Sequence, residues 1–440
     1  MFETLKQAFK VKEIRIKIWI TLALLLVYRL GCYIPVPGVG TELITKDTVE
    51  SLSYLNIMNM MTGGSLQTGT LFAMGIGPYI NSSIIIQLLA VAIPSLERLS
   101  KQGEEGRKKI SQYTRYLTII LAIIQATGIL LNYSDTLVTS NNQTPLSALL
   151  FEQEWLAKVV VILFFTAGTV ITMWIGERIT DYGVSNGISL LIFAGIISTA
   201  GSTFIDMISN IWGTDGGNLQ NFWKLVFMLV AIIVVFTCIV TVELAERKIP
   251  VQYAKQIRGQ KMYGGQSTVI PIKVNSNGVL PLIFAFSILS FPELIMTLFG
   301  VKEGGFVEFW AKYMGTNSWV YMVVLSLLII FFAYFYTSIQ FNPDDISKSI
   351  QQNGGFIMGI RPGKPTAQYL KKISGRITLF GAIFLALIAL VPSLIFKAID
   401  PSSYSVFTAT GMLIAVSVAI EFNTALQSQI MMKNYKGFLK

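Results

Sequence analysis

Side chains that could do chemistry are few and widely spaced in this chain. Among 440 residues there is no histidine, and the two cysteines, Cys32 and Cys238, are isolated in apolar runs. Histidine is the commonest acid–base group and metal ligand, and cysteine metal sites need closely spaced pairs. No phosphate-binding GxxxxGK[ST] loop is present either. The sequence therefore predicts a protein that is not an enzyme and has no metal site or cofactor.

The polar residues inside the apolar segments are neutral. The ionisable ones, by contrast, lie towards segment ends, as Arg29 and Glu243 do. A carrier of ions or charged solutes usually places acids or bases near the bilayer midplane. Neutral amides and hydroxyls suit hydrogen bonding between helices and an apolar constriction that opens and closes. The mid-segment polar residues are Asn81, Ser82, Ser83, Gln87 and Gln125.

The composition identifies the elements that must position these residues. The chain is 53% hydrophobic and 13% charged, with a mean hydropathy of +0.60. Soluble domains carry about 25% charged residues, so a soluble enzyme, a disordered chain and a coiled coil are excluded.

A membrane span needs about 20 mostly apolar residues. Ten continuously apolar segments approach this length, and their continuity favours helices over a β-barrel. They are Ile18–Ile34, Leu71–Ile93, Tyr116–Leu131, Val159–Ile175, Ile188–Ile205, Leu225–Val242, Val279–Leu298, Val320–Ile339, Ile377–Phe396 and Phe407–Phe422.

The basic residues divide unequally between the two sides of such a bundle. Of 34 Lys and Arg, 27 fall in the N-terminal segment, the even-numbered connections and the C-terminal segment. Cytoplasmic loops carry an excess of Lys and Arg. We therefore expect a multi-pass protein of the cytoplasmic membrane with an even number of spans and both termini in the cytoplasm. The formal charge of +10 then mainly reflects the Lys and Arg residues that mark the cytoplasmic loops.

Two cytoplasmic connections, about 245–277 and 340–376, are longer than simple links require. In the first, β-prone stretches flank the segment Arg258–Gly265, which predicts a hairpin. In the second, glycines and prolines surround Arg361 and place it at the tip of a turn. These loops are either solvated connectors or a docking surface for a large acidic or RNA-bearing partner. Their length and turn chemistry favour docking.

Spans 2 and 7 are interrupted in the same way. Gly75, Gly77 and Pro78 break the second segment, and Gly278 and Pro281 open the seventh. Interrupted segments at matching positions of two halves indicate an inverted repeat with a central pathway. We therefore predict an N-terminal half, residues 1–215 with spans 1–5, and a C-terminal half, residues 216–440 with spans 6–10. Five spans in each half require opposite orientations in the membrane.

Several motifs resemble the SecY family, whose members form the central subunit of the bacterial protein-conducting channel. They occur in family order along nearly the whole chain: Gly31–Gly38, Ile76–Gln87, Gly106–Tyr116, Tyr263–Asn275 and Gly359–Gly363. The resemblance implies an all-α membrane protein of ten transmembrane helices, arranged as a clamshell of two inverted five-helix halves. Such a channel translocates secretory proteins and releases membrane segments sideways into the lipid.

The resemblance also implies a central pore that is closed at rest, with a plug and a ring of side chains that seal it. A plug at about 55–71 would include Asn56, Met60, Gly63, Gly64 and Leu66. A ring of aliphatic side chains would seal the waist around a moving chain. Within it, Ile80/Ile84 and Ile188/Ile192 are i, i+4 pairs, so each pair shares a helix face. The ring residues are Ile80, Ile84, Ile188, Ile192, Ile283 and Ile414.

A lateral gate between spans 2 and 7 would include Ser83, Gln87, Leu280 and Ser287. Docking of the motor ATPase SecA or the ribosome would use the tips of the two long loops. The chain departs from the family at the hairpin tip, where Gln260 occupies a position that is usually basic. The docking residues by position are Lys255, Arg258, Lys261 and Arg361.

The implied partners are SecE, a SecG-like subunit, SecA, ribosomes with a possible ribosomal RNA contact, signal peptides, nascent polypeptides and membrane lipid. A secondary transporter with inverted repeats is the main alternative, and the neutral midplane argues against it. An insertase or scaffold without a pore is a second alternative. A membrane enzyme is disfavoured because histidine and clustered acids are missing.

Overall fold

Each of the ten predicted apolar segments overlaps a helix. The computed structural model describes residues 2–37, 39, 53–100, 102–139, 154–212, 219–253, 256–258, 261–263, 267–275, 278–298, 305–315, 318–399 and 409–437. The helices that contain these segments are α2 (Lys12–Gly31), α5 (Gly77–Ala92), α7 (Glu104–Thr139), α9 (Glu154–Tyr182), α10 (Gly187–Trp212), α11 (Leu219–Glu243), α12 (Leu280–Leu298), α14 (Trp319–Gln340), α16 (Lys364–Ile399) and α17 (Ala409–Gly437). The predicted boundary between the halves, at 215/216, lies outside the described residues.

By length and apolar composition alone, only some of these ten helices qualify as membrane spans. Within the described ranges, six helices are long and apolar enough to cross a membrane. The number rises to seven when α5 is joined to α6 (Pro94–Ser100) across a bend of 108°. Helices α10 and α12 contribute shorter apolar stretches. The predicted all-α membrane fold is confirmed. The predicted ten spans are consistent with these helices, because α2, α10 and α12 also contain predicted apolar segments.

The glycines and prolines of span 2 break the helix where the sequence predicts. Of the segment Leu71–Ile93, only Gly77–Ala92 is helical, and Pro78 occupies the first turn. Proline is tolerated there because the first N–H groups of a helix have no intrahelical partner. The preceding residues form turns, including Gly75 with a φ of +49°, a conformation that L side chains rarely adopt.

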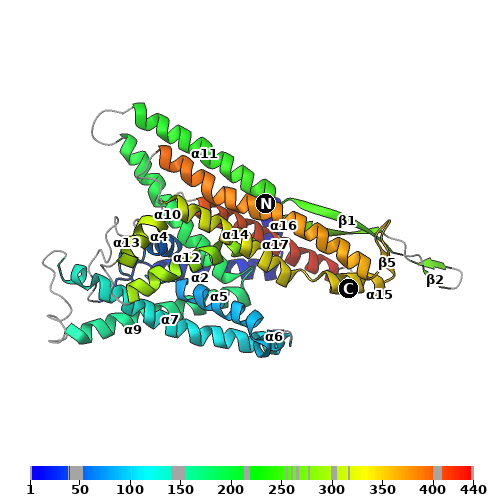
Figure 1. The fold of residues 1–440 in the computed structure, drawn as a ribbon, viewed down its shortest axis with the longest axis horizontal. Helices are drawn as coiled ribbons and strands as arrows, with labels where there is room; N and C mark the ends of the chain where they lie inside the picture. Colours follow the sequence, from blue (N-terminus) through cyan, green and yellow to red (C-terminus); the bar gives the residue numbers. More distant parts are fainter. Residues whose placement is uncertain are drawn as a thin grey trace.

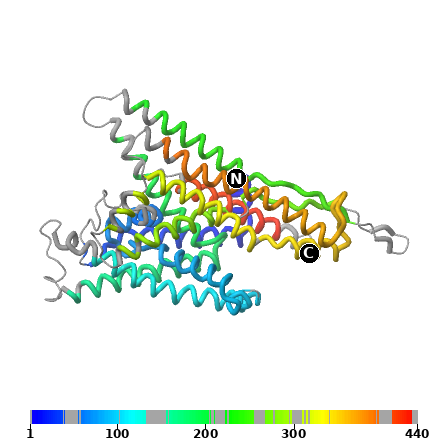
Figure 2. Tube along the Cα trace, in the orientation of Figure 1, coloured from blue at the N-terminus to red at the C-terminus, as the bar shows by residue number. Residues whose placement is uncertain are grey.

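The two long loops that the sequence assigns to one side lie towards one end of the molecule. Figure 1 shows strand β1 (Glu246–Tyr253) and helix α15 (Pro343–Gln352) in its right-hand half with the C-terminus, and the N-terminus and α6 nearer the middle of the long axis. Helix α1 (Phe2–Lys10) packs there on α2 and α17, and α13 (Gly305–Met314) lies at the opposite end. In Figure 2 the traces of α5 and α7 run along one side of the molecule, and that of α11 runs along the opposite side. The fold thus brings the two long loops towards the C-terminal end of α17.

The predicted hairpin is present, and it belongs to a larger sheet. Strands β1 (Glu246–Tyr253) and β4 (Ser267–Lys273) pair antiparallel, from Glu246 opposite Lys273 to Gln252 opposite Ser267. At the tip, β2 (Gln256–Arg258) pairs with β3 (Lys261–Tyr263). A short strand of the second loop, β5 (Gly355–Phe356), pairs with the other edge of β1. The two long loops are therefore joined by backbone hydrogen bonds.

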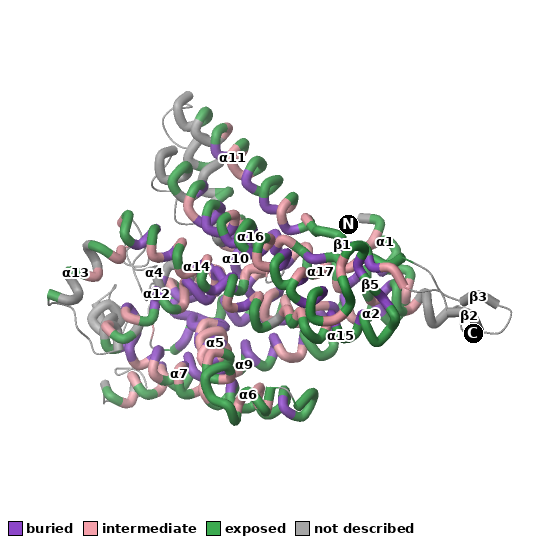
Figure 3. Tube along the Cα trace, turned by 45° about the vertical axis from the view of Figure 1, so that its right-hand side comes forward, coloured by how far each residue is buried: buried purple, intermediate pink, exposed green. Residues whose placement is uncertain are grey.

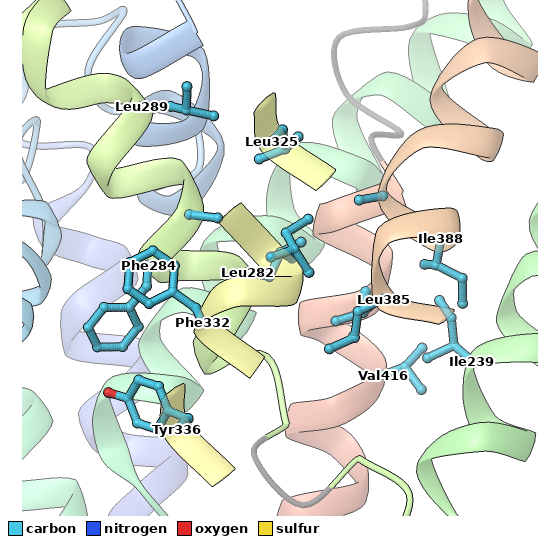
Figure 4. Packing of buried hydrophobic residues seen from close by; sticks show 14 of the residues in the cluster. Ile239, Leu282, Phe284, Leu289, Leu325, Phe332, Tyr336, Leu385, Ile388 and Val416 are labelled. Atoms are coloured by element: carbon cyan, nitrogen blue, oxygen red, sulfur yellow. The ribbon is translucent and has the colours of Figure 1, made fainter. Parts of the chain in front are cut away.

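A large apolar core lies where α11, α12, α14, α16 and α17 meet. In Figure 4 the rings of Phe284, Phe332 and Tyr336 pack together between α12 and α14. The ring centroids of Phe284 and Tyr336 are 4.8 Å apart. Aromatic pairs prefer such tilted arrangements and stabilise the core beyond simple burial.

The outer helix faces are apolar and exposed. Trp19 is 62% exposed, Leu163 61% and Phe227 67%. Exposed residues of this kind lie along the outside of α11 in Figure 3, while buried residues fill the centre. Large exposed apolar surfaces are rare on soluble monomers. In a membrane, lipid covers such surfaces. The chain is a multi-pass membrane protein.

Candidate channel, plug and gate

Three predicted ring residues from three helices line one cavity. Ile80 of α5, Ile283 of α12 and Ile414 of α17 contribute to its wall, together with Ile196 of α10. The remaining lining residues are neutral side chains and glycines. This wall offers no fixed charge to a passing chain. Such an apolar constriction can exclude ions by dewetting.

The other ring residues lie in the two apolar clusters that flank this cavity. Ile192 is buried beside Ile414, and Ile188 packs against the same cluster. Ile84 is buried in the cluster shown in Figure 4, and Ile283 packs against it. Ile80 contacts both clusters. The fold thus gathers the six isoleucines around one region, although the first and the last of them, Ile80 and Ile414, are separated by about three quarters of the chain.

The predicted plug, at about 55–71, begins within helix α4 (Ser53–Thr62), which borders the cavity. Met58, Met60 and Met61 line the cavity from this side. The remaining space is about 70 Å³, enough for only a few water molecules. Leu66, just beyond α4, is fully buried. Helix α4 therefore occupies one side of the space between the isoleucines.

Close backbone contact attaches the end of α4 to α10. A Cβ atom at Gly195 would collide with the carbonyl oxygen of Met61, so the two backbones touch there. The hydroxyl of Thr199, one turn further along α10, donates to the carbonyl of Met60 at 3.4 Å. Gly63 and Gly64 then reverse the chain with φ values of +70° and +89°. The predicted plug residue Asn56 lies in α4, but its side chain is outside the described part.

Arg29 reaches this junction from α2. Its guanidinium donates to the hydroxyl of Ser198 on α10 and lies over the ring of Tyr33. A Cβ atom at Gly63 would meet the same guanidinium. The sequence placed Arg29 near a span end without indicating a role. Only the tertiary fold shows that it contacts the turn that follows α4.

Two of the predicted gate residues form a polar chain from α5 to α14. The side-chain amide of Gln87 donates to the hydroxyl of Ser83 at 3.0 Å. The hydroxyl of Tyr336 donates to the amide oxygen of Gln87. Of the α12 pair, Ser287 lines the cavity and Leu280 begins the helix with 38% of its surface exposed. Sequence reasoning missed Tyr336 because nothing in its local pattern distinguishes it from other aromatic residues of span 8.

A groove of about 1070 Å³ lies beside this polar chain. Gln87, Phe284 and Tyr336 line one part of it, and the charged residues of its lining are Lys364 and Lys371 of α16, Glu97 of α6 and Asp344 of α15. The groove therefore joins predicted gate residues to a region of mixed charge. It is far larger than the cavity lined by the isoleucines.

The predicted docking residues are only partly described. Arg361 is exposed, and the hydroxyl of Thr366 donates to its backbone carbonyl at 2.8 Å. Arg258 and Lys261 are opposite each other in the β2–β3 ladder, but their side chains are outside the described part. Lys255 is outside it altogether. The turn at the tip of the second loop is thus fixed by the hydrogen bond from Thr366, and the side chain of Arg361 faces solvent.

Comparison with known proteins agrees with this geometry. The SecY family profile matches residues 70–423. The protein translocase subunits SecY of Streptomyces galbus and Streptomyces coelicolor are 39% and 40% identical, each over all of both chains.

Solved channels share the fold. A structure described as a protein-conducting channel has a TM-score of 0.67 at 20% identity and covers 94% of this chain and 92% of its own. Sec61 from a canine ribosome–channel complex has a TM-score of 0.63 at 19% identity, with the same coverage. With an identity near 40% over its full length and a family match over most of it, this chain belongs to the SecY family.

Proposed function

We propose that this chain forms the pore of a Sec translocase in the cytoplasmic membrane, where it passes secretory proteins outwards and releases membrane segments into lipid. As a SecY-family channel subunit it conducts protein rather than a small solute. The observation that carries the proposal is the uncharged cavity between α5, α12 and α17, filled on one side by α4. A pore for chains of any sequence must not bind any of them strongly, and an aliphatic wall meets that need.

The groove beside Gln87 supports a route for signal peptides. Helices α5 and α14 both line it, and the hydrogen bond from Tyr336 to Gln87 links them there. An apolar signal helix could replace the packing of Phe284, while Lys364 and Lys371 of α16 could attract acidic groups of a precursor. Parting α5 from α12 and α14 would then open the pore to lipid.

The joined cytoplasmic loops support docking of SecA or a ribosome at Arg361 and the hairpin tip. The chain is passive in this proposal, and its partner supplies the energy. SecE and a SecG-like subunit would complete the complex, and both termini would lie in the cytoplasm. A ribosome would also bring RNA phosphate to the basic tip, to which arginine binds well.

Reconstitution tests the proposal. The chain is placed in proteoliposomes with SecE, and SecA, ATP and a secretory precursor are added outside. We expect protease-protected precursor that depends on ATP. No import, while a known SecY complex is active in parallel, would contradict the proposed function.

The plug distinguishes a channel from a scaffold. Deletion of residues 55–71 should raise the ion conductance of the resting protein in a planar bilayer, because the deletion removes Met58, Met60 and Met61 from the cavity wall. An unchanged conductance would favour a scaffold without a pore. The transporter alternative is not favoured, since the SecY relatives and the channel structures point to protein conduction.

A further inference from the structure

A buried carboxyl group lies where the docking hairpin joins the membrane helices. Glu243 is the last residue of α11 and is only 9% exposed. The side-chain amide of Asn275 donates to its Oε1 atom at 2.9 Å, and the hydroxyl of Ser417 donates to the same oxygen. Both donors are themselves buried. Buried carboxyl groups need such partners to offset their desolvation.

The three residues belong to three functional elements. Glu243 precedes β1 and Asn275 follows β4, so they mark the two ends of the hairpin root. Asn275 also lies shortly before α12, the gate helix. Ser417 lies on α17, three residues after the ring residue Ile414, and therefore on the same helix face. One oxygen atom thus connects the hairpin, the entry to the gate helix and a helix of the pore wall.

Further contacts make this root rigid. The backbone N–H of Val274 donates to the carbonyl of Ala245 at 2.9 Å, which extends the hairpin ladder to the membrane helices. A Cβ atom at Gly381 would lie 2.6 Å from the carbonyl oxygen of Val274, so α16 also touches the root. Lys273 interacts electrostatically with both Glu243 and Glu421 of α17. The hairpin root therefore cannot shift without moving the hydrogen bonds at Glu243.

We propose that Glu243 is a positioning residue that couples partner docking at the hairpin to the pore, by fixing the hairpin root against α17 beside Ile414. This inference rests on the proposed function. Energetic coupling needs a physical link between two sites whose arrangement both sites influence. Glu243 supplies that link between the hairpin and the pore wall, which lie at different depths of the molecule.

Ser417→Ala tests the link, because it removes one hydrogen bond and little volume. The complex is reconstituted with SecE, and three quantities are measured: SecA affinity, SecA ATP turnover, and precursor imported per ATP hydrolysed. We expect SecA affinity to stay within about twofold and import per ATP to fall at least about fivefold, the lower range of coupling between sites. Ser428→Ala is the matched control, since its exposed hydroxyl bonds only to Thr424 of its own helix, and it should change neither quantity.

Glu243→Gln and Glu243→Ala separate the roles of the residue. The glutamine keeps an Oε1 acceptor for both donors and should retain most of the import per ATP, whereas the alanine should lose it. If Ser417→Ala leaves import per ATP unchanged, or lowers SecA affinity as strongly as import, the coupling role is overturned. A glutamine variant as defective as the alanine variant would also overturn it. If the unmodified complex itself neither binds SecA nor imports, the proposed function fails, and this inference fails with it.

Discussion

The hydroxyl of Tyr336 on α14 donates a hydrogen bond to the amide oxygen of Gln87 on α5, a helix of the proposed gate. Such bonds between membrane helices contribute modestly, about 0.6 kcal/mol on average. A gate that must open for each signal peptide suits a weak and local bond better than extensive polar pairing. The strength of this bond should therefore set how readily the gate opens.

Tyr336→Phe should make the gate easier to open. The loss of about 0.6 kcal/mol from the closed state should raise import of precursors with weakened signal sequences about twofold to threefold. Tyr334→Phe is the matched control, because its hydroxyl donates to the carbonyl of Gly375 on α16 and not to α5. Import assays with graded signal sequences measure the difference. Equal effects of both variants would argue against a gate role for Tyr336.

Ile283→Ser should make the closed channel leak. The serine hydroxyl would hydrate a cavity whose wall is otherwise mostly apolar, and hydration removes the dewetting barrier. We expect at least a severalfold rise in resting ion conductance in planar bilayers. Ile288→Ser on the same helix is the control, since Ile288 is 38% exposed and is not part of the cavity wall. A leak of the same size in both variants would contradict a sealing role for Ile283.

For individual residues, the sequence predicted which positions matter but not which distant side chains they bond to. The i, i+4 spacing showed that Ile80 and Ile84 share a face, and family resemblance supplied their role. The hydrogen bonds of Gln87 with Tyr336 and of Glu243 with Ser417 join residues far apart in the chain. Local patterns carry no information about such bonds, because tertiary packing alone brings the two groups together.

Helix α4 lies in backbone contact with α10 at Gly195, and this contact should set the position of the proposed plug. Gly195→Ala should push α4 away from α10, at a cost of about 1–3 kcal/mol typical of overpacking. The expected result is a higher resting conductance and a lower melting temperature. Both can be measured on the purified complex.

Gly201→Ala is the control for that substitution. It lies on the same helix, and a Cβ atom there would meet nothing within 4 Å. Replacing a helical glycine by alanine without steric conflict stabilises a helix by about 0.5–1 kcal/mol. We expect an unchanged conductance and an equal or higher melting temperature. A leak in this variant as large as that of Gly195→Ala would show that α4 is not the cause.

The elements themselves were largely predictable. Ten apolar segments marked ten helices, and glycine with proline marked the start of α5. The hairpin of β1 and β4 followed from β-prone stretches around a glycine pair. Strand β5 was not predictable, since two residues, Gly355 and Phe356, carry no periodicity. Its strand conformation comes from its pairing with β1.

The whole molecule has a strongly basic end, and docking there should depend on charge. Arg361→Glu should weaken SecA binding at least about tenfold, because it replaces an attraction at a solvent-exposed tip by a repulsion. Lys348→Glu makes the same charge change on exposed α15 of the same loop and should have a much smaller effect. Binding to the reconstituted complex is measured at two salt concentrations. Equal losses would indicate a diffuse electrostatic attraction rather than a defined contact at Arg361.

The pairing of β5 with β1 has a mechanical consequence. A load applied at Arg361 passes directly into α16, and through the β5–β1 hydrogen bonds it also passes into α11. Strand β1 has eight residues, which at about 3.3 Å each makes a lever arm of about 26 Å. A docked partner would therefore exert a torque on two neighbouring helices at once, and a small tilt at the cytoplasmic tip would become a rotation of the helix pair within the bilayer.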